Sequence, residues 1–278
     1  MPHTDVLLSG GDGEVIERAL FVTCQNNLGY ADNSYQRLYY GNEFCEQLIP
    51  SAAELGEAVK FALNRSMAFT LVTPYVTESG LDKLKTLFRG LQTNAESAEV
   101  VFNDWGVFRV LRHEFSQLTP VMGRLMNKMK RGPRLMVVID KLPETTVEYF
   151  RNSSLVVPLY RNYLLTNGIG RVELDNPLQG VELPLDGFNV SLYVPFAYVS
   201  TSRICLTASC DKPNCEDYVG IFPCHRECRK YTFGLSNEIM PVMLIRKGNT
   251  IFFENQSFPV NLEDVGISRL VVQPELPM

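Results

Sequence analysis

The sequence lacks the features of a membrane-spanning or secreted protein. No apolar run approaches the roughly 20 residues that a helix needs to cross a bilayer. The first residues, Met1 to Asp5, do not open a basic stretch followed by an apolar core, which would mark a secretory signal. We therefore expect a cytoplasmic protein with no membrane span.

An excess of positive charge is also missing. The chain has 26 Lys and Arg residues against 31 Asp and Glu residues, a formal net charge of −5. This mild acidity gives no overall electrostatic footprint for nucleic acid, which is therefore not an expected partner. The one dense basic stretch is read as a solvated loop in preference to a local RNA-binding patch; it contains Arg124, Lys128, Lys130, Arg131 and Arg134.

Several catalytic and nucleotide-binding motifs are absent. No G-x-G-x-x-G follows the first predicted strand, and no G-x-x-x-x-G-K-[ST], G-x-S-x-G or H-E-x-x-H occurs. Only three histidines are present, at positions 3, 113 and 225. We expect His113 to be solvated or to cap a helix, and His225 to tune a neighbouring cofactor by a hydrogen bond. The sequence thus gives no positive case for proteolysis.

What the sequence does contain is a regular alternation of strand and helix patterns. About eight parallel-type strands in 278 residues favour a TIM-barrel-like α/β fold, complete or imperfect, as one domain over residues 1–278. The predicted strands are Arg18–Cys24, Arg37–Tyr40, Phe69–Thr73, Glu99–Asn103, Pro120–Leu125, Leu135–Asp140, Arg171–Asp175, Asn189–Pro195 and Ser268–Gln273. The predicted helices are Glu54–Leu63 (N-cap Ser51), Leu81–Leu91 (N-cap Ser79), Val107–Phe115, Thr145–Asn152 and Val157–Asn167. A hairpin is expected near the C-terminus, between Val242–Ile245 and Ile251–Glu254.

The seven cysteines are the most informative residues. Five of them fall within 24 residues, at 205, 210, 215, 224 and 228, and the others are Cys24 and Cys45. An odd count without a signal peptide argues against a disulfide framework and favours metal binding. A zinc ribbon would need paired C-x2-C knuckles, and the closest pair here is Cys224-x3-Cys228. Iron–sulfur clusters accept more scattered thiolates, so residues 203–231 are predicted to form a cluster-binding segment.

Loops that follow the strands of a βα barrel converge on one face, where functional sites are built. Cys45 follows the predicted strand Arg37–Tyr40, and Cys205 follows the predicted strand Asn189–Pro195. We therefore expect these thiols to meet over the barrel mouth. Cys24 also ends a strand, and a small apolar residue in the barrel wall is its favoured interpretation.

Polar residues near strand ends are candidates for substrate binding or catalysis. We single out Asp104, Arg124, Glu173 and Arg203. Asp104 is as well explained as the cap of the helix that follows it. Glu173 alternates with Arg171 and Asp175, so these three side chains share one face of a strand, either the lumen or the outside. Arg203 is suited to a carboxylate-bearing substrate.

Several segments, in order, resemble the collagenase-like peptidase family (U-32), and within it the iron–sulfur members of the UbiU/UbiV type. The similar segments are Tyr39–Cys45 (YYGNEFC), Asn103–Val107 (NDWGV), Pro120–Asn127 (PVMGRLMN), Ser202–Ala208 (SRICLTA) and Cys224-x3-Cys228 followed by Lys230-Tyr231. Residues 131–155, the first 30 residues and the last 20 carry little of this similarity. The resemblance implies a barrel with an oxygen-sensitive 4Fe–4S cluster.

Carried over by position, the resemblance implies Cys45, Cys205, Cys224 and Cys228 as cluster ligands. Cys210 and Cys215 are extra thiols in a lengthened insert, so they are possible alternative ligands. The implied function is that of one subunit, with a UbiU-like partner in a heterodimer, of an oxygen-independent hydroxylase that acts on a small molecule such as the ubiquinone ring, with prephenate as oxygen donor. Alternatives are a zinc-stabilised scaffold without catalysis, or RNA-base hydroxylation or peptidase activity as in other members.

Overall fold

The fold is a closed barrel of parallel strands. The structure, a computed structural model, describes residues 16–95, 97–183, 185–212, 222–257, 262 and 266–278. Around the barrel the strand order is β1-β12-β7-β6-β5-β4-β3-β2. The bounds are β1 (Glu17–Val22), β2 (Arg37–Gly41), β3 (Ala68–Val72), β4 (Glu99–Phe102), β5 (Thr119–Met122), β6 (Arg171–Asp175), β7 (Asn189–Val194) and β12 (Ile267–Val272). The predicted TIM-barrel-like α/β fold is confirmed.

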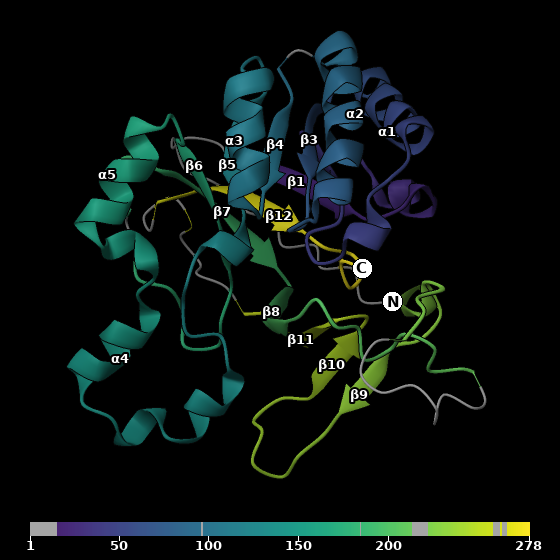
Figure 1. The fold of residues 1–278 in the computed structure, drawn as a ribbon. Helices are drawn as coiled ribbons and strands as arrows, with labels where there is room; N and C mark the ends of the chain where they lie inside the picture. Colours follow the sequence, from purple (N-terminus) through teal and green to yellow (C-terminus); the bar gives the residue numbers. More distant parts are fainter. Residues whose placement is uncertain (1–15, 96, 184, 213–221, 258–261, 263–265) are drawn as a thin grey trace.

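Helices connect the strands on the outside of the barrel. They are α1 (Ala52–Asn64), α2 (Glu78–Asn94), α3 (Trp105–Glu114), α4 (Glu144–Arg151) and α5 (Pro158–Thr166). Figure 1 shows α1, α2 and α3 side by side against the first half of the barrel, with α4 and α5 beyond β6. The predicted capping box of α1 is confirmed, since Ser51 and Glu54 each accept the other's backbone N–H. None of the described helices is both long and apolar enough to cross a membrane.

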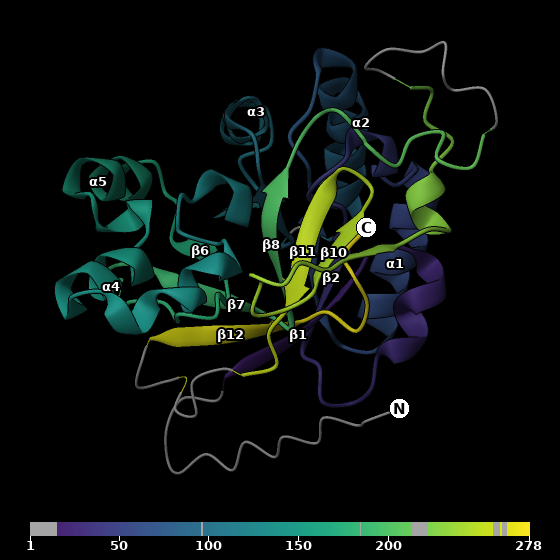
Figure 2. The same cartoon turned by 90° about the horizontal axis from the view of Figure 1, so that it is seen from below.

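A second sheet lies between β7 and β12 in the sequence. It is antiparallel, in the order β8-β11-β10-β9, with bounds β8 (Phe196–Thr201), β9 (Phe233–Leu235), β10 (Leu244–Lys247) and β11 (Thr250–Glu254). The predicted hairpin is the β10–β11 pair. Figure 2 shows β8, β11 and β10 in front of the barrel strands, so this sheet stands over one end of the barrel.

Strand alternation divides the core into two layers. Outward-facing residues such as Leu20, Leu38 and Val100 pack with the buried faces of the helices. Inward-facing residues form a separate apolar cluster in the barrel lumen, with Phe21, Tyr39 and Tyr193 in mutual edge-on contact. Both layers follow from the two-residue period of a strand, which sends neighbouring side chains to opposite faces.

Two local predictions are wrong, and two strands are missed. Residues 135–140 form short 3-10 turns, Pro133–Val137 and Ile139–Lys141, in place of a strand. A proline begins the first turn, and proline is disfavoured in a central strand. Helix α2 begins at Glu78 with Thr77 as its cap, because the Thr77 hydroxyl, and not that of Ser79, accepts a helix N–H. Strands β8 and β9 were not predicted, because they are stabilised by pairing with the distant β11 and β10.

Candidate functional site

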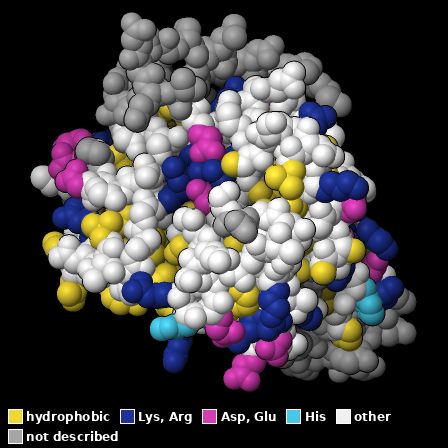
Figure 3. All heavy atoms as spheres, turned by 90° about the horizontal axis from the view of Figure 1, so that it is seen from above, with side chains coloured by type: hydrophobic (Ala, Val, Ile, Leu, Met, Phe, Trp, Pro, Cys, Tyr) yellow, Lys and Arg dark blue, Asp and Glu magenta, His cyan; other side chains and the backbone are white. Residues whose placement is uncertain are grey.

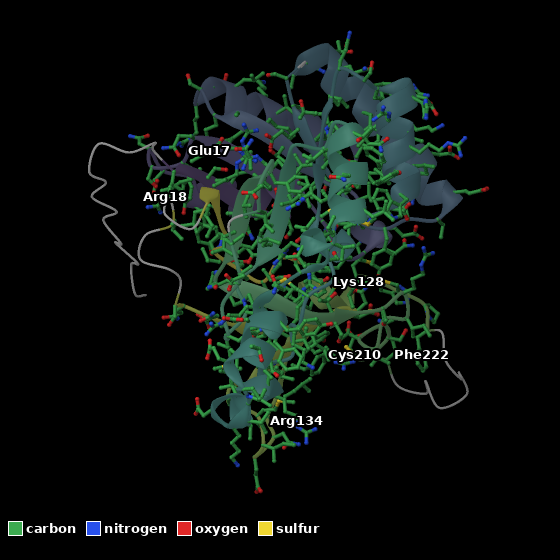
Figure 4. All side chains as sticks on the ribbon, turned by 90° about the vertical axis from the view of Figure 1, so that its left-hand side faces the viewer. Glu17, Arg18, Lys128, Arg134, Cys210 and Phe222 are labelled. Atoms are coloured by element: carbon green, nitrogen blue, oxygen red, sulfur yellow. The ribbon has the colours of Figure 1, made fainter. Side chains whose placement is uncertain are left out.

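The candidate site lies at the end of the barrel where the strands finish. Cys45 is carried by the loop after β2, and the cysteine-rich segment connects β8 to β9 in the sheet above. Figure 4 labels Cys210 and Phe222, which border the undescribed residues 213–221, on the opposite side of the molecule from Glu17 and Arg18 at the start of β1. The thiols therefore belong to the C-terminal mouth, the face that carries the sites of βα barrels.

Cys205 and Cys224 lie close enough to Cys45 and Cys228 to contribute to a raised pKa in both. Burial raises the pKa of Cys45, and Cys224 and Cys205 raise it further. Burial also raises the pKa of Cys228, to about 11, with further increases from Cys45, Cys205 and Cys224. All six cysteines that the structure describes are free thiols. Cys45, from the loop after β2, thus lies within electrostatic range of thiols of the cysteine-rich segment.

The four thiols differ in how far they are exposed to solvent. Cys228 is buried, Cys45 and Cys205 are half-buried, and Cys224 is exposed. Cys45 and Cys228 pack on one small apolar cluster that also contains Phe44, Tyr198 and Met278. Hence the site has an apolar floor and an open outer side.

The loop that carries Cys45 has a fixed shape. Gly41 has φ +131°, and a Cβ there would lie 2.2 Å from the carbonyl oxygen of Val72, so only glycine fits. The Asn42 side chain accepts the backbone N–H groups of Phe44 (3.0 Å) and Cys45 (2.9 Å). The backbone N–H groups of Gln47 and Leu48 act on Cys45 in the direction that lowers its pKa.

Glu227 joins the two halves of the cysteine-rich segment. Its buried carboxylate accepts the backbone N–H of Ser209 (2.9 Å) and that of His225 (3.0 Å). Burial alone would raise the pKa of Glu227, but these amides and its own outweigh burial and lower it. The segment that follows Cys205 is therefore fixed next to the segment that contains Cys224 and Cys228.

Two of the thiols have polar neighbours close by. The backbone N–H of Arg226 donates to the Cys224 sulfur at 3.4 Å, and Thr207 shares a hydrogen bond with Cys205 at 3.3 Å. Within the described part of the chain, no three Cys, His, Asp or Glu side chains are near enough to one another to hold a metal ion. Binding of one metal centre would draw the four sulfurs closer together than they lie here.

The two predicted alternative cluster ligands are Cys210 and Cys215. Cys210 is exposed, and its pKa is raised by desolvation and then by Asp211 and Glu227. Cys215 lies outside the described residues. His225 is exposed, and the contact it makes with Glu227 is through its backbone N–H.

Beneath the thiols, Arg124 forms the centre of a buried ion-pair network. Its guanidinium binds both carboxylate oxygens of Glu43 and donates to Asp175 at 2.8 Å. Arg131 donates to the other oxygen of Asp175 at 2.7 Å. The Arg124 guanidinium also lies 3.9 Å from the ring centroid of Tyr193. The two arginines and two carboxylates balance in charge, and the partners of Arg124 come from the loop after β2 (Glu43) and the end of β6 (Asp175).

This network concerns two predictions, the role of Arg124 as a candidate site residue and the nature of the basic stretch. The Arg124 side chain is fully buried and pairs with two carboxylates of the protein itself. In the basic stretch, Arg124 and Arg131 are buried, while Lys128, Lys130 and Arg134 are exposed. Both earlier interpretations of that stretch, RNA patch and solvated loop, are therefore wrong for the two arginines. On the face seen in Figure 3, basic and acidic side chains are interspersed.

Glu173 lies in the barrel lumen together with Tyr39. The Tyr39 hydroxyl donates to Glu173 at 2.9 Å and accepts from Arg269 at 2.6 Å. Burial raises the pKa of Glu173 to about 7, although Tyr193, Arg269 and Tyr39 act to lower it. The second carboxylate oxygen and the Tyr193 hydroxyl have no hydrogen-bond partner of normal geometry among the described residues. Of the two faces considered from sequence, the lumen is the one that holds Glu173.

The other two predicted candidates for substrate binding or catalysis are Asp104 and Arg203. Asp104 caps α3 by accepting the backbone N–H of Gly106 at 2.6 Å, and it accepts that of Val76 at 3.3 Å. The capping interpretation thus explains Asp104. Arg203 is exposed, with its guanidinium 5.4 Å from the ring centroid of Tyr75. His113 is exposed in the last turn of α3, as expected.

Sequence reasoning missed two residues that organise the site, Glu227 and Asn249. Asn249 donates from its side-chain nitrogen to the carbonyl oxygens of Phe44 (2.7 Å) and Ser202 (2.6 Å). Asparagine is ordinary in a hairpin turn, so nothing in the local sequence marks Asn249 as part of the site. Glu227 stands beside Cys228, and an acidic residue in an otherwise basic flank was the available signal.

Comparison with known proteins leaves the family open. No protein-family profile matches the chain, and no curated protein matches it in sequence. Similar solved structures include the U32 peptidase Mk0906 (10% identity, 97% of each chain covered, TM-score 0.48). Others are a GH18 chitinase from Cycas revoluta in complex with (GlcNAc)3 (8% identity, 93% of this chain and 94% of that chain, TM-score 0.40) and the spore cortex-lytic enzyme SleL of Bacillus megaterium QM B1551 (10% identity, 95% and 71%, TM-score 0.39). At such low identities and TM-scores, these likenesses establish neither family nor activity.

Proposed function

We propose that this protein binds a 4Fe–4S cluster at the C-terminal mouth of the barrel through Cys45, Cys205, Cys224 and Cys228. The observation that carries the proposal is that free thiols from two distant segments lie near one another, since Cys205 and Cys224 help to raise the pKa of both Cys45 and Cys228. Neighbouring thiols oppose one another's ionisation, whereas a cationic metal centre stabilises several thiolates at once. The gathering is thus suited to a metal centre.

The surroundings of the sulfurs suit a cluster better than a closed structural zinc site. Backbone N–H groups lie near the Cys45 and Cys224 sulfurs, and hydrogen bonds to sulfur tune the potentials of iron–sulfur clusters. Burial raises the pKa of Cys228 to about 11, and Lys247 acts in the opposite direction, toward the thiolate. When bound, such a cluster supplies one-electron transfer. Exposed Cys224 leaves the outer side of the site open to a substrate or partner.

We extend the proposal to the reaction on the ground of the resemblance to the UbiU/UbiV type. The chain would be one subunit of an oxygen-independent hydroxylase, paired with a UbiU-like partner and acting on a small molecule, with prephenate as the donor. Arg203 supports this reading, because its exposed guanidinium is two residues from Cys205 and is able to bind a carboxylate in bidentate fashion. Glu43 and Arg124 would hold the floor of the site without touching substrate, since both are fully buried.

The direct test is elemental analysis of the protein purified under strict anaerobiosis. The proposal predicts iron together with acid-labile sulfide, and a brown sample with broad visible absorbance. Zinc as the main metal, in a colourless sample, would favour a zinc-stabilised scaffold. Co-purification of a second barrel protein with this chain would support the heterodimer, and recovery of the chain alone with a full cluster would count against it.

A further inference from the structure

Asn249 connects the two segments that carry Cys45 and Cys205. Its side-chain nitrogen donates to the carbonyl oxygen of Phe44, the residue before Cys45, across 205 positions of sequence. The same nitrogen donates to the carbonyl oxygen of Ser202, three residues before Cys205. It also lies 3.0 Å from the Tyr75 hydroxyl.

The orientation of this amide is set by its partners. Carbonyl oxygens only accept hydrogen bonds, so the atom that faces Phe44 and Ser202 must be the nitrogen. The amide oxygen accepts the Thr250 hydroxyl at 3.1 Å, and the backbone carbonyl of Asn249 accepts the N–H of Ser202 at 3.2 Å. The amide nitrogen has two hydrogens for three acceptors, and its two shortest contacts are to the carbonyls of Phe44 and Ser202, one from each segment, with the Tyr75 hydroxyl farther away.

We propose that Asn249 is a positioning residue that sets the separation of the Cys45 and Cys205 sulfurs. The inference rests on the proposed function, because it assigns Asn249 to the support of that cluster. Aspartate has the same size but would turn a carboxylate oxygen toward two carbonyl oxygens, which repels both segments. Alanine removes the connection without adding repulsion.

Asn255 offers a matched control on the same strand-and-turn unit. It follows β11 and is buried, and its side-chain nitrogen faces the carbonyl oxygens of Asn176 (3.1 Å) and Pro177 (3.5 Å), at the far end of the sheet from the thiols. Asn255→Asp therefore introduces the same chemical conflict in the same sheet. It leaves the contacts of Phe44 and Ser202 unchanged.

The first measurement uses the metal-free protein. Dibromobimane bridges two neighbouring thiols, and peptide mass spectrometry gives the yield of the Cys45–Cys205 link. We expect a several-fold lower yield in Asn249→Asp than in the wild type, a smaller loss in Asn249→Ala, and a wild-type yield in Asn255→Asp. A wild-type yield in both Asn249 variants would overturn the inference, and the alanine variant keeps the test decisive if the aspartate variant does not fold.

The second measurement uses anaerobically reconstituted protein. The reduced cluster of the Asn249 variants should have an altered electron paramagnetic resonance spectrum and a shifted reduction potential, whereas Asn255→Asp should match the wild type. The two proposals fail separately. A wild type that binds no iron defeats the cluster while the cross-linking result still judges Asn249, and an unchanged spectrum and link in the Asn249 variants defeats only the role of Asn249.

Discussion

The guanidinium of Arg124 binds both carboxylate oxygens of Glu43, and neither side chain is accessible to solvent. Glu43 stands two residues before Cys45, so this ion pair joins the loop of the first candidate ligand to the loop after β5. Charges buried in this way are costly to separate, because the partner left behind has no water to solvate it.

Replacement of Arg124 by methionine should lower the free energy of unfolding by about 3–5 kcal/mol, since Glu43 loses the buried cation that pairs with it and Asp175 loses one of its two ion pairs among the described residues. The double variant Glu43→Gln/Arg124→Met should be more stable than the sum of the single effects predicts. Urea unfolding followed by circular dichroism measures all three. The control is Arg134→Met, at an exposed arginine, which should change stability by no more than about 0.5 kcal/mol. Equal, small effects of the two arginine substitutions would contradict the buried network.

Glu173 should make the protein less stable as the pH rises from its ordinary pKa of 4.5 to the raised value of about 7. In this window the folded protein keeps a proton that the unfolded chain has released, so each rise in pH favours unfolding. Above pH 7 the contribution is constant, and its full size is on the order of 3 kcal/mol. Glu173→Gln removes it. Urea titrations across this window should show a difference between wild type and variant that changes with pH, and a difference of constant size would show that the pKa of Glu173 is ordinary.

Gly41→Ala should destabilise the protein and disturb the Cys45 loop, because the added Cβ would lie 2.2 Å from the Val72 carbonyl oxygen at a φ of +131°. Gly56→Ala is the control. Gly56 lies within α1 with no atom within 4 Å of an added Cβ, so alanine there should stabilise the protein by about 0.5–1 kcal/mol. Thermal unfolding of the two variants compares them directly. Similar melting temperatures would show that the backbone at Gly41 tolerates a side chain.

Much of the barrel is predictable because its signals are local. The strand Arg37–Tyr40 was predicted from its aromatic and apolar residues, and the two-residue period of a strand then places Tyr39 on one face and Leu38 and Tyr40 on the other. The cap of α1 is likewise fixed by Ser51 and Glu54 alone. By contrast, β8 and β9 depend on pairing with strands far along the chain, and no local pattern specifies that pairing.

Part of the candidate site was also predictable from the sequence, and part was not. Cys45 could be placed at the mouth because it follows a parallel strand of the barrel, whereas Cys205 follows β8 of the antiparallel sheet, a strand that was not predicted. The burial of Arg124 could not be foreseen, since it depends on carboxylates from the loop after β2 and the end of β6. Asn249 was missed for a similar reason: its two carbonyl partners become neighbours only in the folded chain.

The most direct test of the central claim is the iron and acid-labile sulfide content of anaerobically reconstituted wild type, Cys45→Ser and Cys24→Ser. Cys24 is a free, half-buried thiol outside the proposed ligand set, which makes it the matched control. The account predicts about four iron atoms per chain in the wild type and in Cys24→Ser, and loss of the cluster in Cys45→Ser. Full iron and sulfide in Cys45→Ser would contradict it.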